Sequence, residues 1–143
     1  MFAVMPITEA QIASVVAEAS SRMHETEYIT SQVNAFIAAQ PMIARYVISH
    51  SDELTVEGVV TVLFHAAPIH LSISRARGAA SALVQISELD AAAQQSPTVE
   101  ELSRVEPDLA SYIASNIELG QHKAADQVAR TVLAHVAQSL VST

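Results

Sequence analysis

Apolar residues along this chain recur mainly every three or four positions, which is the spacing of helices that bury one face. The stretches that show this spacing most clearly are residues 8–23, 79–95 and 121–140. Around His24–Thr26 the apolar register slips, so a helix there either breaks or bends. We therefore predict an all-α fold, a single-domain helical bundle of six to eight helices over residues 1–143.

Local start signals support this division into helices. A threonine followed three residues later by Gln or Glu has the spacing of a capping box, and a proline suits the first turn of a helix. The sequence predicts helix starts of these two kinds at Thr8, Pro41, Thr98 and Pro107.

The stretch over residues 55–77 differs from the others because its middle is apolar on every side. It begins at a capping residue, Thr55, and ends with two arginines near the negative end of the helix dipole. Its β-branched residues also fit a buried strand, but its length and the lack of a partner strand favour a helix. Pro68 lacks the donor for the carbonyl of Phe64, so we expect this central buried helix to be kinked or broken near Pro68.

Composition and charge narrow the function classes. Fifteen acidic against seven basic residues give a net charge of −8, which repels phosphate backbones, so we expect no nucleic-acid partner. The uncharged run from Gly58 to Ile73 has 16 residues, whereas a spanning helix needs about 20, and the first residues lack the basic start of a signal peptide. We therefore expect no membrane contact and a cytoplasmic location. The absence of cysteine excludes disulfides and thiolate chemistry.

The low charge content favours association. Charged residues make up 15% of the chain, against about 25% in an average domain, and the mean hydropathy is +0.30. A homodimer or other homo-oligomer would hide part of such a surface, although exposed Ala and Ser account for the same composition without association. Our first hypothesis is a non-enzymatic protein that acts through protein–protein interaction, self-associates and binds a protein partner. A regulatory role is one version of it.

Candidate chemistry lies in the histidines of the central stretch. His65 and His70 flank Pro68, and a kink there would open a small pocket for a metal or a small apolar ligand. On an ideal helix their side chains point about 140° apart, so only a kink would let them share a metal ion. His50 and Glu53 are candidate helpers. Our second hypothesis is a bundle that binds a metal or apolar ligand here, with an enzymatic role open and no particular cofactor indicated.

His135 lies on the apolar stripe of the last stretch, with Val128 and Val132. A histidine in such a place more often fixes the packing of a core than performs catalysis. We therefore expect it to be a buried histidine with hydrogen-bond partners.

No catalytic motif is present, since three glycines spread along the chain cannot form a P-loop, a dinucleotide fingerprint or a hydrolase elbow. Residues 74–83, SRARGAASAL, resemble the A-H-x-L-K-G-[SA]-[SA] signature of histidine phosphotransfer domains, with Arg77 and Gly78 at its K-G positions. The position of the essential histidine is Ser74 here. The resemblance thus implies at most a helical bundle without phosphotransfer, and it assigns no family.

Overall fold

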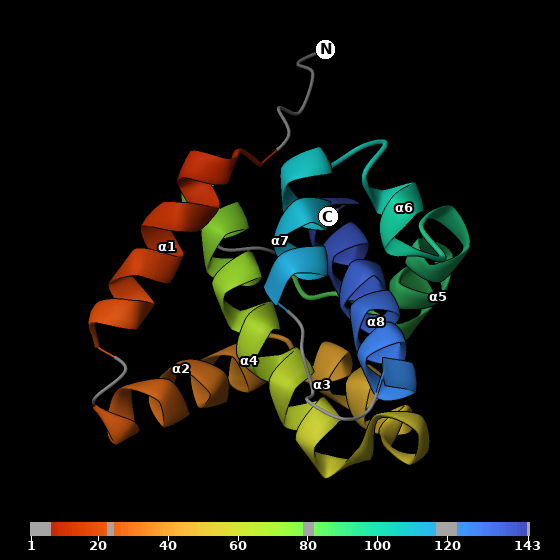
Figure 1. The fold of residues 1–143 in the computed structure, drawn as a ribbon, viewed down its shortest axis with the longest axis horizontal. Coiled ribbons are helices and arrows are strands. Elements are labelled where there is room, and N and C mark those ends of the chain that lie inside the picture. Colours follow the sequence, from red (N-terminus) through yellow and green to blue (C-terminus); the bar gives the residue numbers. More distant parts are fainter. Residues whose placement is uncertain (1–6, 23–24, 79–81, 117–122, 143) are drawn as a thin grey trace.

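The structure is a computed structural model that describes residues 7–22, 25–78, 82–116 and 123–142. Within these ranges the chain forms eight α-helices and no strand, which confirms the predicted all-α fold (Figure 1). The helices are α1 (Glu9–Ser21), α2 (Thr26–Ala39), α3 (Pro41–Ser49), α4 (Ser51–Arg77), α5 (Ile86–Gln95), α6 (Val99–Leu102), α7 (Pro107–Asn116) and α8 (Lys123–Ser142).

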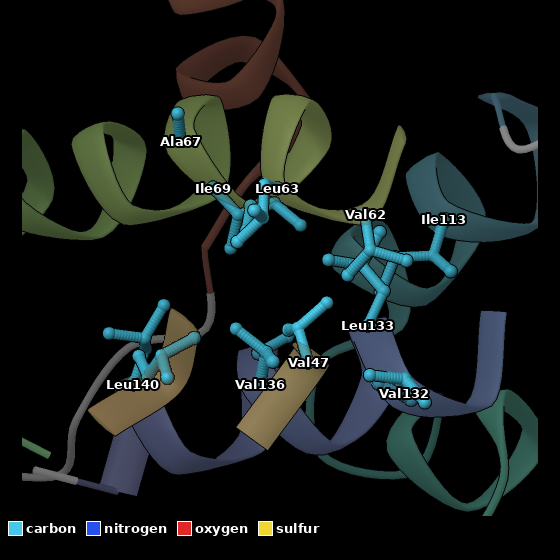
Figure 2. Close-up of a cluster of buried hydrophobic side chains, with 14 of the residues drawn as sticks. Val47, Val62, Leu63, Ala67, Ile69, Ile113, Val132, Leu133, Val136 and Leu140 are labelled. Carbon is cyan, nitrogen blue, oxygen red and sulfur yellow. The ribbon is translucent and has the colours of Figure 1, made fainter. Parts of the chain in front are cut away.

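The predicted central helix is α4, which packs against α1, α2, α3 and α8. In Figure 1 it lies in the middle of the molecule, with α1 to its left and α8 to its right. The contact between α4 and α8 is the most extensive in the fold. Figure 2 shows apolar side chains of both helices meeting there, among them Val62, Leu63 and Ile69 from α4 and Val132, Leu133 and Val136 from α8.

The predicted helix starts at Thr8, Pro41, Thr98 and Pro107 are confirmed. At the first of them, Thr8 Oγ1 accepts from the Gln11 N–H at 3.2 Å, and Gln11 Oε1 accepts from the Thr8 N–H at 2.9 Å. The slip of the apolar register is a break, because α1 ends at Ser21 and α2 begins at Thr26. Residues 23 and 24 themselves lie outside the described ranges.

Of the kink or break predicted near Pro68, the break does not occur, because α4 continues through this residue. Backbone dihedral angles stay helical through Pro68, and the non-helical residue inside α4 is Thr55, at φ 66° and ψ 172°. A proline inside a helix costs about 3 kcal/mol, which the packing of four neighbouring helices on α4 offsets. Thr55 does cap the long segment as predicted, since its Oγ1 accepts from the Gly58 N–H at 3.5 Å.

The helix predicted over residues 79–95 begins only at Ile86. Residues 82–85 directly before it are not helical, and residues 79–81 lie outside the described ranges. The fully buried side chain of Gln40 accounts for this difference. Its Nε2 donates to the Ala82 carbonyl and its Oε1 accepts from the Val84 N–H, both at 2.9 Å. The amide therefore satisfies backbone groups of a non-helical segment, which a helix would have paired internally.

The last helix is more buried than its amphipathic sequence predicts. All residues from Val132 to Leu140 are buried, including the polar residues His135, Gln138 and Ser139, each of which has a hydrogen-bond partner. The predicted start of this helix near residue 121 falls outside the described residues. The centre of the bundle thus consists of α4 and α8 together.

Candidate functional site

The two histidines predicted as a site have different neighbours. His65 Nδ1 lies 3.0 Å from Tyr112 Oη on α7. The His70 ring makes an edge-on contact with Phe36 of α2, at 5.4 Å between ring centroids, and its buried Nε2 has no hydrogen-bond partner among the described residues. Burial lowers the pKa of both imidazoles, so both are neutral at pH 7.

The candidate helpers do not join them. The His50 ring lies 5.0 Å from the ring of Tyr46, while Glu53 is exposed at the start of α4. In the part of the chain that the structure describes, no three His, Asp or Glu side chains form a group that could hold a metal ion. The metal form of the second hypothesis therefore stays a prediction without geometric support.

The second hypothesis also allows a small apolar ligand, and the structure has a cavity beside Pro68. A cavity of about 40 Å³ with mostly apolar walls lies between α1, α2 and α4. Its walls consist of Val15 and Ala19 from α1, Tyr28, Gln32 and Val33 from α2, and Phe64, Ala67, Pro68 and Leu71 from α4. Pockets for drug-sized ligands have about 300–1,000 Å³, so this cavity accepts only a very small apolar molecule unless its walls move.

His135 is the buried core histidine that the sequence predicts. Its Nδ1 lies 2.8 Å from Tyr46 Oη and its Nε2 lies 3.3 Å from the Pro97 carbonyl oxygen. Because a carbonyl only accepts, Nε2 carries the proton and the Tyr46 hydroxyl donates to Nδ1. Burial, together with the nearby His50, lowers the pKa of His135. Both members of the pair are buried, so this arrangement joins helices and leaves no room for a substrate.

An exposed apolar face lies at the start of α4. Val56 is 80% exposed and Val60 59%, the highest values among the large apolar side chains of the described residues. The two valines lie one helical turn apart and project to the same side. We call Val56 and Val60 the valine face. In Figure 1 this part of α4 is the yellow ribbon at the bottom of the molecule.

The sequence does not predict this face, because the same apolar run is interpreted as fully buried. The signal that distinguishes it is the surrounding polarity, since Glu57 lies between the two valines and Asp52 and Glu53 precede them. Carboxylates are rarely buried, so a covered helix start seldom carries three of them. Acidic residues also favour the positive end of the helix dipole, which is a second reason for their presence here.

α4 is also the one helix among the described residues that is long and apolar enough to cross a membrane. Within its most apolar window of 18 residues, 44% of the residues are buried. A core helix of a folded domain meets the same criterion, so length and composition alone do not assign α4 to a membrane. The value does show that more than half of this apolar window is not fully buried.

Compared with known family models, curated protein sequences and solved structures, the chain shows no significant match. Fold class alone does not indicate a function, because the same helical architectures carry many unrelated activities. The function therefore has to be inferred from the valine face and the cavity at Pro68.

Proposed function

We propose that this protein is a non-enzymatic helical protein that acts through protein–protein interaction, and that the valine face is its contact surface. The observation that supports the proposal is the exposure of Val56 and Val60, at 80% and 59%, at the start of the most apolar helix. Fully burying one valine side chain contributes about 1.5–3 kcal/mol of favourable free energy. A partner that covers the valines would gain this free energy on binding. When no other partner is present, we expect two copies to associate through this face.

The charges around the valine face indicate a weak dimer. Each copy carries exposed carboxylates at Asp52, Glu53 and Glu57, which two associating copies would bring toward each other. Added salt screens such repulsion between exposed charges and strengthens the contact. Two valines are also a small part of a standard interface of about 800 Å² per partner. We therefore expect association in the micromolar range or weaker, and stronger association at higher salt.

Sedimentation velocity over a range of protein concentrations tests the proposal. The wild type should gain mass with concentration, whereas the double variant Val56→Ser, Val60→Ser should stay monomeric. Val105→Ser is the matched control, because Val105 is 53% exposed in the turn between α6 and α7. A double variant that associates as well as the wild type contradicts the proposal, and a wild type that stays monomeric contradicts self-association through this face.

A second candidate function is the binding of a small apolar ligand at Pro68, which the apolar lining of the cavity favours. Xenon is a suitable probe for a cavity of this size, and NMR signals of Phe64 and Tyr28 in its walls should shift on saturation. Ala19→Leu should fill the cavity and abolish the shift. Unchanged signals in the wild type would rule this candidate out. Elemental analysis of the purified protein tests the metal form with His65 and His70.

A further inference from the structure

We infer that the valine face takes a basic amphipathic helix of another protein. This inference rests on the proposed function, because it names the kind of partner for the same surface. Val56 and Val60 form a narrow apolar strip on one side of α4. A partner helix meets such a strip with apolar residues spaced three and four positions apart, as amphipathic helices do in apolar grooves.

The charged side chains that α4 itself carries beside the strip are all acidic. Asp52, Glu53 and Glu57 are exposed, and none of them forms an ion pair or a side-chain hydrogen bond with any described residue. α4 contains no Lys or Arg before Arg75, and the nearest preceding cation in the sequence is Arg45 on α3. A partner that buries the valines therefore places its own polar side chains among unpaired carboxylates.

Acidic residues at a helix start also interact favourably with the helix dipole, which explains part of this pattern without a partner. One observation goes beyond that explanation. The helix dipole gives no reason for two neighbouring valines, Val56 and Val60, to remain exposed beside these carboxylates.

The backbone at Thr55 holds these two features together. A β-branched residue at φ 66° is an outlier, and such outliers concentrate at functional sites. Here the outlier ends the short turn that carries Asp52 and Glu53 and starts the long segment that carries Val56. Asp52 and Glu53 precede Val56 by four and three residues, so the acidic turn lies directly before the apolar strip along the chain.

A basic helix fits this surface better than a second copy does. A second copy has a net charge of −8 and brings the same carboxylates to the contact, whereas a basic helix supplies cations to them. The two contacts therefore respond to salt in opposite directions. Added salt should strengthen the dimer and weaken the complex with a basic helix.

The probe is a synthetic peptide of about 18 residues, or five helical turns, with leucines on one face and lysines and arginines on the other. One comparison peptide has glutamates in place of the basic residues, and a second has the same composition in a scrambled order without an apolar face. Binding to the full chain is measured by fluorescence anisotropy at low and at physiological salt. The basic amphipathic peptide should bind, and more weakly at the higher salt.

Variants of the protein locate the contact. Val56→Ser, Val60→Ser should weaken binding of the basic peptide by about tenfold or more, because the apolar burial is lost while the charges remain. Glu53→Gln, Glu57→Gln should weaken it severalfold and reduce its salt dependence. Val105→Ser should bind as the wild type does. All these side chains are exposed, so circular dichroism should show the fold unchanged.

The inference is overturned if the scrambled or acidic peptide binds as tightly as the basic amphipathic one, or if the valine double variant binds it equally well. Sedimentation of the same samples separates this failure from failure of the proposed function. A wild type that dimerises through the valine face but binds no basic peptide overturns the inference alone. A wild type that neither associates nor binds the peptide overturns both.

Discussion

The two helices at the centre of this molecule, α4 and α8, have burial that is the reverse of what their sequences suggest. α4 is apolar on every side of its middle, yet Val56 and Val60 are exposed at its start. α8 has polar positions at regular intervals, yet all residues from Val132 to Leu140 are buried. The difference teaches that burial depends on which elements cover a helix, and that apolar positions left uncovered are candidates for association.

Polar residues can stay in the core of α8 because each of them has a hydrogen-bond partner. His135 bonds Tyr46 of α3, and Gln138 accepts from Ser96 Oγ at 2.8 Å. Since a buried polar group with a partner costs little and one without a partner costs about 1–3 kcal/mol, these contacts decide whether the helix can be enclosed. The following predictions use this contrast between the two helices.

The largest expected effect is a difference in the free energy of unfolding between two valine-to-alanine variants, one in each helix. Val136→Ala in α8 removes methyl groups from a site with 0% exposure and should lower the free energy of unfolding by about 2–3 kcal/mol. Val60→Ala in α4 should change it by less than about 0.5 kcal/mol, because Val60 is 59% exposed in a single copy. Urea unfolding at low protein concentration measures both, and equal effects would remove the contrast between the helices.

Removal of the Tyr46 hydroxyl group, which bonds His135 of α8, should destabilise the protein. Tyr46→Phe deletes the donor to His135 Nδ1 and leaves that nitrogen buried without a partner, so we expect a loss of about 1–2 kcal/mol in the free energy of unfolding. Tyr28→Phe, on the half-exposed tyrosine that stacks on Arg22, serves as the control and should have little effect. Equal stability of the Tyr46 variant and the wild type would show that the bond contributes nothing.

At the start of α4 a substitution should stabilise the protein. Thr55→Gly relieves a conformation that costs a non-glycine residue about 1–3 kcal/mol, and it loses a helix cap worth about 1 kcal/mol, so we expect a net gain of about 1 kcal/mol. Thr61→Gly, in the regular part of α4, should instead destabilise by about 1 kcal/mol. Thermal unfolding of both variants checks the opposite signs. A destabilised Thr55 variant would mean that the positive φ carries no strain.

The smallest expected effect is a dependence on pH. Burial lowers the pKa of His65, His70 and His135 below their ordinary value of 6.5. Between the folded and unfolded pKa the unfolded chain binds more protons, so stability is full above about pH 6.5 and is lost as the pH falls through the folded pKa. Unfolding curves between about pH 7.5 and 5.5 should show this loss, and His135→Gln should show a smaller one. A flat profile in the wild type contradicts the lowered pKa values.

Local signals account for most of what the sequence could predict of the fold. Thr8 and Pro41 begin helices because capping and proline geometry depend on a few adjacent residues. The late start of α5 depends on Gln40, which contacts a segment 42 residues away, and no local pattern contains that contact. The same limit explains why α4 continues through Pro68 without a break, since the helical conformation there depends on packing with other helices.

Of the candidate site, the sequence indicates the right region for the cavity but not its lining. Pro68 does line a cavity, while His65 and His70 point to partners on α7 and α2. The valine face could not be predicted from hydropathy, because a buried and an uncovered apolar stretch have the same composition. The capping prediction at Thr55 is correct, yet its positive φ is a consequence of how the short turn before it joins the long segment.

Methyl NMR of valine-labelled protein tests the central claim most directly, because it observes both helices in one sample. As the concentration rises from micromolar toward millimolar, the methyl signals of Val56 and Val60 should shift, while those of Val132 and Val136, with at most 1% exposure, should stay constant. This result would show that the valine face associates and that the buried part of α8 takes no part in the contact. Constant signals from Val56 and Val60, in a sample whose mass rises with concentration, would contradict the account.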